Sequence, residues 1–208
     1  MKRFAALLLL AMAVPAAAAD VPATGGDPFT EALAQARERR VPVLIDYSAP
    51  WCYSCYYMAK NVLTGPEWER AHREAVVIEL DADSPVGAKW MAAWSVKAMP
   101  TYLVFNADGA ELGRILGEQT RGDFYAWLFS TIGRDPLDAV KGKVTNGAPA
   151  SVVAGHEVLR AYHARYDAKG GQEWFRHLPE SARRSLAKDN LAAAWMARLE
   201  LMRAAAEK

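Results

Sequence analysis

The sequence is poor in cysteine. Only two of its 208 residues, Cys52 and Cys55, are cysteines, and they lie three positions apart. A zinc site on this pair would need two more ligands, usually Cys or His, and no histidine lies at a ligand spacing close to it. A structural disulfide across so short a loop would constrain the unfolded chain little, because the entropic gain grows with loop length. We therefore favour a redox-active dithiol, with zinc binding and a structural disulfide as alternatives.

The sequence also lacks an excess of one charge and any apolar run long enough to span a bilayer. It has 25 Lys and Arg against 24 Asp and Glu, so neither a nucleic acid nor a membrane surface is indicated as a partner. The apolar run 4–14 is shorter than the roughly 20 residues that a span requires. Lys2 and Arg3 precede this run and small residues follow it at 17–19, which predicts a cleavable secretory signal over 1–19. We expect a periplasmic or otherwise exported protein whose mature chain has no membrane span.

The cysteines lie at a predicted strand-to-helix junction. Residues 43–48 are apolar and β-prone, and residues 56–60 have no Pro or Gly and favour a helix. The N-terminus of a helix stabilises a thiolate on the first cysteine. The spacing places both sulfurs on one side of the first turn, close enough to form a disulfide. In an oxidising compartment the pair forms that disulfide unless a partner reduces it.

The apolar runs and chain breakers predict the order α-β-α-β-α-β-β-α. The helices are expected at 28–40, 52–62, 67–73, 85–94 and 121–132, and the strands at 43–48, 75–80, 102–105 and 111–116. Strands separated by helices indicate parallel crossovers, and the closing hairpin adds an antiparallel pair. This part of the chain is therefore predicted to be an α/β domain with a central mixed sheet flanked by helices.

The C-terminal part of the sequence predicts helices. Three glycines and two prolines at 133–150 indicate a linker with one short helical turn. A helix is expected over 151–169, ended by Gly170-Gly171, then a short helix after Pro179 and a last helix capped by Asp189. We divide the chain as follows: signal peptide 1–19, flexible leader 20–26, α/β domain 27–132, linker 133–150 and α-helical C-terminal extension 151–208. The sequence does not choose between packing, partner docking and dimerisation for the extension, nor does it predict the oligomeric state.

Three features of residues 41–130 are similar to those of the thioredoxin superfamily. They are the motif Trp51-Cys52-Tyr53-Ser54-Cys55, the acidic Asp46 six residues before Cys52, and the segment Met99-Pro100-Thr101. The order and length of the predicted elements match the superfamily as well. The stretches 43–55, 61–68 and 106–109 further resemble the periplasmic C-terminal domain of the thiol transporter DsbD.

The resemblance implies a thioredoxin fold and a redox disulfide between Cys52 and Cys55. Cys52 would be the nucleophile and the more exposed sulfur, and Cys55 would resolve the mixed disulfide formed with a protein substrate. Asp46 would lie buried beneath the disulfide, where burial raises its pKa, and would accept the proton of Cys55. Pro100 would follow a cis peptide bond and face the disulfide.

The resemblance also implies contacts to the substrate and the partners of the protein. Trp51, Tyr53, Met99 and Pro100 are expected to contact protein thiol and disulfide substrates, and an upstream redox partner is expected, with no cofactor and no metal. The sequence departs from the superfamily at two places. Glu79 aligns where thioredoxins have a lysine beside the buried acid, and Tyr53-Ser54 stands where they have Gly-Pro.

The leading interpretation is an exported thiol–disulfide oxidoreductase that acts as a reductase. Because the motif does not fix the direction of exchange, a disulfide oxidase or an isomerase is an alternative. A thioredoxin-like binding module, with the cysteines delivering copper as a chaperone, is a further alternative from another functional class.

Overall fold

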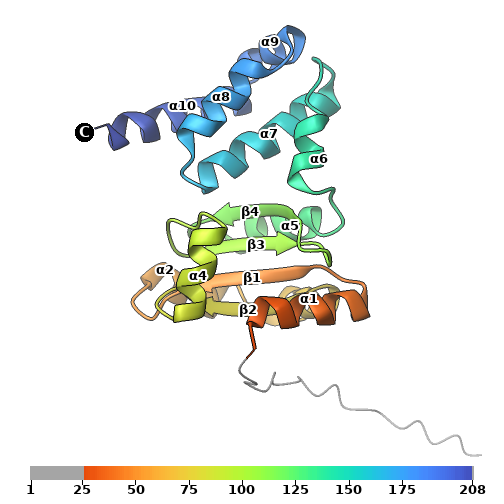
Figure 1. Cartoon of the computed structure of the whole chain (residues 1–208), viewed down its shortest axis with the longest axis vertical. Helices are drawn as coiled ribbons and strands as arrows, with labels where there is room; N and C mark the ends of the chain where they lie inside the picture. The colour runs from red at the N-terminus through yellow and green to blue at the C-terminus, as the bar shows by residue number, and fades with distance from the viewer. Residues whose placement is uncertain (1–25, 208) are drawn as a thin grey trace, which may run out of the picture.

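The structure is a computed structural model that describes residues 26–207. The expected signal peptide and all but the last residue of the expected leader lie outside these residues. Within 26–207, no helix combines the length and the apolar character that crossing a membrane requires. Figure 1 shows an α/β unit and a helical unit that stacks against one edge of its sheet.

The α/β unit has the predicted order, α1-β1-α2-α3-β2-α4-β3-β4-α5, in which α2 and α3 form the region after the cysteines. Its strands are β1 (Val43–Ser48), β2 (Val76–Asp81), β3 (Thr101–Phe105) and β4 (Glu111–Leu116). Its helices are α1 (Pro28–Arg39), α2 (Tyr53–Asn61), α3 (Gly65–Glu74), α4 (Pro85–Ala93) and α5 (Arg121–Thr131). The α/β prediction is therefore confirmed.

Helix α3 corrects one detail of the prediction. The helix was expected to begin at residue 67, after Gly65-Pro66, but these two residues begin it, with Thr64 as the N-cap. Gly65 has a φ of +73°, which glycine adopts readily. Pro66 stands in the first turn, where an N–H has no partner within the helix. A Gly-Pro pair thus starts this helix instead of separating it from the preceding segment.

The four strands form one mixed sheet in the order β2-β1-β3-β4. Strand β1 is parallel to β2 and antiparallel to β3, and β3 and β4 form the predicted antiparallel hairpin. Gly109 closes the hairpin turn, since its N–H donates to the Asn106 carbonyl at 3.0 Å. Strand β1 is central, so its C-terminal end, which leads to the cysteines, is held on both sides.

Both faces of β1 are covered, as its apolar sequence predicts. Leu44 packs on the face that α2, α3 and α5 cover, and Ile45 and Tyr47 pack on the face that α1 and α4 cover. On the second face, the Phe29 ring meets the rings of Trp90 and Trp94 edge-on, with centroids 5.0 and 4.7 Å away. The two tryptophans are therefore packing residues.

The C-terminal unit is helical, as predicted. Its helices are α6 (Leu137–Gly142), α7 (Pro149–Ala164), α8 (Ala168–His177), α9 (Glu180–Lys188) and α10 (Asn190–Ala206). They enclose an apolar cluster of their own. The expected helical turn in 133–150 is α6, and Leu137, Val140 and Val144 of this segment are buried in that cluster. The segment therefore packs as part of the helical unit.

The end of α7 differs from the prediction. The helix ends at Ala164, and Gly170-Gly171 lies inside α8 instead of ending α7. Asp167 caps α8 by accepting the Gly170 N–H at 2.8 Å. A Cβ at Gly171 would lie 2.8 Å from Leu199 Cδ1, so this glycine lets α8 pack closely on α10. Gly171 therefore serves the contact between helices, which a pattern of local breakers does not reveal.

The helical unit lies against the edge strand β4 (Figure 1), and ion pairs join the two. Glu111 of β4 accepts hydrogen bonds from Arg114 at 2.7 and 2.8 Å, and from Arg165, the C-cap residue of α7, at 2.6 Å. On the same interface Glu157 of α7 pairs with Arg134 and Arg160. The interface covers the outer side of β4, which would otherwise be an open sheet edge.

Candidate active site

The two cysteines form a disulfide at the N-terminus of α2. Cys52 is the N-cap residue, and its Sγ accepts the N–H of Cys55 at 3.1 Å. The Cys52 N–H in turn donates to the Ala49 carbonyl at 3.0 Å, which closes the loop after β1. The Cα atoms of the bonded cysteines lie 5.2 Å apart. The first sulfur thus sits where the unpaired N–H groups of a helix end favour negative charge.

The exposure of the two cysteines is the reverse of the prediction. Cys52 is only 6 % exposed and belongs to the core cluster that contains Ala49 and Val96, whereas Cys55 is partly exposed. The reason is that the loop after β1 places the N-cap residue, Cys52, in contact with the core. Cys55 follows at the first turn and lines an open cavity. The helix N-terminus, and not exposure, distinguishes Cys52.

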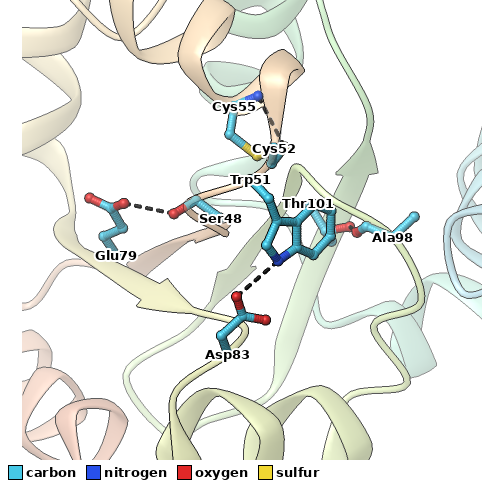
Figure 2. The surroundings of a disulfide bond; sticks show 8 residues. All are labelled: Ser48, Trp51, Cys52, Cys55, Glu79, Asp83, Ala98 and Thr101. Carbon is cyan, nitrogen blue, oxygen red and sulfur yellow. Dashed lines mark hydrogen bonds between the residues drawn. A yellow bond between two sulfur atoms is a disulfide. The ribbon is translucent and has the colours of Figure 1, made fainter.

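Aromatic side chains surround the disulfide. Trp51 is 68 % exposed, and its Nε1 donates to Asp83 Oδ2 at 2.8 Å, as Figure 2 shows beside Cys52. Tyr53 is 83 % exposed and Tyr56 is 65 % exposed. Exposed apolar side chains that gather in one patch often mark a site of protein–protein contact. The surface next to the disulfide is therefore suited to a protein partner.

Asp46 lies within β1 on the face that α2 covers. It follows Leu44 by two residues, and alternate side chains of a strand share a face. Asp46 and Cys55 line the same cavity of about 350 Å³. Asp46 Oδ1 is buried and has no hydrogen-bond partner among residues 26–207. Burial, and then the negative charge of Glu79, raise the pKa of Asp46 to about 7, as expected for an acid beneath the disulfide.

Glu79 is the direct neighbour of Asp46 in β2, as the alignment predicts. Ser48 Oγ donates to Glu79 Oε1 at 2.7 Å, and Figure 2 also draws this hydrogen bond. Glu79, Ser48 and Asp81 all line the cavity beside Cys55. This side of the site therefore carries negative charge where a lysine stands in thioredoxins.

The loop before β3 supplies the third part of the site. The Met99–Pro100 peptide bond is cis, as the resemblance implies. Thr101 Oγ1 donates to the Ala98 carbonyl at 2.7 Å, and the Gly117 N–H donates to the Pro100 carbonyl at 2.8 Å. The Met99 side chain packs against the cluster that contains Cys52. The structure thus brings the Pro100 loop to the same core cluster as the first cysteine.

Comparison with known proteins agrees with this geometry. A family model described as a thioredoxin-like domain matches residues 29–132, which is half of the chain. The chain belongs to the thioredoxin-like family. A thioredoxin H-type of Oryza sativa subsp. indica is 33 % identical over 93 residues, which cover 44 % of this chain and 70 % of the relative.

Relatives named DsbD also match this member of the thioredoxin-like family. The thiol:disulfide interchange protein DsbD of Cronobacter sakazakii is 35 % identical over 95 residues, which are 44 % of this chain and only 16 % of that relative. The reduced C-terminal domain of Neisseria meningitidis DsbD is 25 % identical, with a TM-score of 0.43 over 50 % of this chain and 93 % of that domain. The match to the Cronobacter sakazakii protein thus spans only a small part of a full-length DsbD and less than half of this chain.

Sequence reasoning missed Tyr102 as a neighbour of the site. Tyr102 in β3 pairs with Asp46 in β1, on the side opposite to Glu79. It is fully buried, and its hydroxyl has no hydrogen-bond partner in the part of the chain that the structure describes. The signal was available in part, because Tyr102 lies two residues after Pro100 in a predicted strand. The register between β1 and β3 was needed to place it beside Asp46.

Proposed function

We propose that this protein is an exported thiol–disulfide oxidoreductase that reduces disulfides in other proteins. The observation that carries the proposal is the position of Cys52 as the N-cap of α2, with the Cys55 N–H directed at its sulfur. When the disulfide is reduced, the same N–H and the helix dipole favour the thiolate on Cys52. The family relationship, and the relatives that are thiol:disulfide interchange proteins, support thiol–disulfide exchange as the activity.

The reaction proceeds in two exchange steps. The Cys52 thiolate attacks one sulfur of a substrate disulfide, so that the substrate S–S bond breaks, a mixed disulfide forms, and the leaving sulfur takes up a proton. Cys55 then loses its proton and attacks the Cys52 sulfur, which releases the second substrate thiol. Two electrons pass from the dithiol to the substrate, and an upstream redox partner restores the dithiol.

Asp46 is proposed as the group that accepts the proton of Cys55. Both residues line one cavity, and a carboxyl whose pKa is about 7 exchanges protons readily near neutral pH. The base must act on the resolving cysteine, because Cys52 is already favoured as a thiolate by its helix. This assignment gives a role to an acid that stands at a buried place, where its charge is costly.

Trp51, Tyr53, Met99 and Pro100 are proposed to contact the substrate. The first two are supported by their exposure and the last two by the position of their loop against the Cys52 cluster. Substrate contacts in this region would hold the disulfide of the substrate next to Cys52.

The division of the chain and its export belong to the same proposal. Residues 27–132 form the redox domain, and residues 133–207 add the helical unit that packs on β4. Residues 1–19 are proposed to direct export to the periplasm. N-terminal sequencing of exported protein tests this point, and an intact Met1 would contradict it.

Insulin reduction tests the activity. Purified protein with a dithiol reductant should accelerate insulin precipitation, and Cys52→Ser should abolish the acceleration. Cys55→Ser should accumulate a mixed disulfide, because the resolving thiol is absent. Ser181→Ala, an exposed change in α9, serves as the control. Stoichiometric Cu(I) binding without any insulin reduction would refute the proposal and favour a metal-delivery module.

A further inference from the structure

Three polar side chains from adjacent strands form a row beneath α2. Glu79 in β2 pairs with Asp46 in β1, and Asp46 pairs with Tyr102 in β3. Tyr102 belongs to the cluster that contains Leu44 and Met58, so it lies on the same face as Asp46. Cross-strand partners on one face have Cβ atoms about 5 Å apart. Asp46 thus stands between a carboxylate on one side and a phenol on the other.

Two atoms in this row lack a partner. Asp46 Oδ1 and the Tyr102 hydroxyl oxygen are both buried, and neither has a hydrogen bond within the described residues. Buried polar atoms are nearly always hydrogen bonded, to protein or to ordered water. A carboxylate only accepts hydrogen bonds and a phenol can donate one, so the two unpaired groups are complementary.

The other groups around Asp46 do not supply such a donor. The Ser48 hydroxyl already donates to Glu79. Among the described residues that line the cavity, none is Lys, Arg or His. The titratable groups that face Asp46 come from three elements: Glu79 and Asp81 from β2, Tyr102 from β3, and Cys55 and Tyr56 from α2. Of the two phenols, Tyr56 is exposed and Tyr102 is buried beside the carboxyl.

We propose that the Tyr102 hydroxyl donates to the Asp46 carboxylate through one bridging water, and that Tyr102 is a positioning residue for proton transfer between Asp46 and Cys55. This inference rests on the proposed function, in which Asp46 accepts the Cys55 proton. A bridging water is favoured over a direct bond because the two groups are cross-strand neighbours without a direct hydrogen bond.

The fixed position and the protonation of Tyr102 suit this role. Its ring is held edge-on by Phe124 of α5, with centroids 4.8 Å apart. Burial, followed by the charges of Asp46 and Glu79, raises the pKa of Tyr102 far above its ordinary value. The hydroxyl therefore keeps its proton at every working pH and is always available as a donor.

The hydrogen bond has a definite effect on Asp46. A donor to the carboxylate stabilises the charged form and opposes the effects of burial and of Glu79. Without the Tyr102 hydroxyl the pKa of Asp46 should therefore rise. At neutral pH a smaller fraction of Asp46 would then be ionised, and fewer molecules would hold the base that Cys55 needs.

Titration of Asp46 by carbon-13 NMR of the oxidised, aspartate-labelled protein tests the inference. Tyr102→Phe should raise the Asp46 midpoint by about half a pH unit or more. Tyr125→Phe, which removes a hydroxyl that donates to the Val62 carbonyl on the same face of the sheet, should leave it unchanged. The pH profile of mixed-disulfide resolution should move upward by the same amount as the midpoint in Tyr102→Phe. An unchanged midpoint in Tyr102→Phe would overturn the inference.

A second measurement on the unsubstituted protein covers the case in which Tyr102→Phe does not fold. The Tyr102 Cζ resonance should follow the Asp46 midpoint, and a Tyr102 resonance that ignores this titration would overturn the inference. The proposed function fails separately. If the protein does not reduce insulin but the midpoint shifts in Tyr102→Phe, the Tyr102–Asp46 link stands and the activity does not. If insulin is reduced and the midpoint stays, only the link fails.

Discussion

Asp46 and Glu79 are direct partners across the parallel strands β1 and β2, so two carboxylates stand side by side beneath the active-site helix. Ser48 holds Glu79 by a hydrogen bond of 2.7 Å, and Asp46 Oδ1 is buried. The charge of Glu79 adds to the effect of burial on the pKa of Asp46. The acid of this protein is thus tuned by a neighbouring anion instead of a cation.

Removal of the Glu79 charge should lower the pKa of Asp46. In Glu79→Gln the like charge is lost, so the pH profile of thiol exchange should move to lower pH by on the order of one unit. Asp81→Asn is the matched control, since Asp81 lines the same cavity but pairs with Ser48 instead of Asp46. A profile that does not move in Glu79→Gln would show that the two acids are not coupled.

The raised pKa of Asp46 makes the stability of the oxidised protein depend on pH. Because the folded protein holds the Asp46 proton more tightly than the unfolded chain, this contribution is fully present below about pH 4 and is lost as the pH rises to about 7. The slope should approach about 1.4 kcal/mol per pH unit within that window.

Asp46→Asn should remove that slope and stabilise the protein at neutral pH. Urea denaturation at several pH values measures the slope of the free energy of unfolding with pH. Asp138→Asn serves as a control at a carboxylate that is 92 % exposed. A slope of the same size in Asp46→Asn and in the unsubstituted protein would assign it to other groups.

The two cysteines should differ in acidity despite their reversed exposure. In Cys55→Ser the remaining Cys52 keeps its place at the N-terminus of α2, so its thiol should titrate below the ordinary value of about 8.5. In Cys52→Ser the remaining Cys55 stands near Asp46 and Glu79 and should titrate at or above that value. Rates of alkylation by iodoacetamide against pH measure both values. Equal midpoints, or a lower one for Cys55, would reverse the roles that we propose.

The free energy of unfolding should depend on Glu111, which lies at the interface between β4 and the helical unit. This carboxylate is buried between Arg114 and Arg165, and its loss leaves the buried Arg114 guanidinium unpaired. Glu111→Gln should therefore lower the free energy of unfolding by about 3–5 kcal/mol in urea denaturation. Glu180→Gln breaks an ion pair whose side chains are both 67 % exposed, and should cost less than about 1 kcal/mol. Similar values for the two variants would mean that the interface is not held by this pair.

Much of the α/β unit could be predicted because its signals are local. Asp27 and Pro28 mark the start of α1, the apolar run 43–48 marks the central strand, and Asn106 to Gly109 marks the hairpin turn. Each of these patterns acts through neighbouring residues, so the sequence alone displays it. Glu79 was placed beside Asp46 by alignment, and the register of β1 and β2 agrees.

The features that could not be predicted depend on contacts between distant segments. The burial of Cys52 results from core residues such as Val96, which are far away in the sequence. Gly171 lies inside a helix because Leu199 of α10 approaches it there. Tyr102 could be placed beside Asp46 only when the register of β3 was known. Periodicity and local breakers carry no information on such contacts.

The reduction potential of the Cys52–Cys55 couple tests the central claim most directly. The purified protein would be equilibrated with dithiothreitol or glutathione buffers, and the fraction of disulfide would be measured at each ratio. A value near that of thioredoxin, about −270 mV, is predicted for a protein that donates electrons to substrate disulfides. A value near that of a strong oxidant, about −120 mV, would mean that the reduced form is the stabilised one and that the protein forms disulfides.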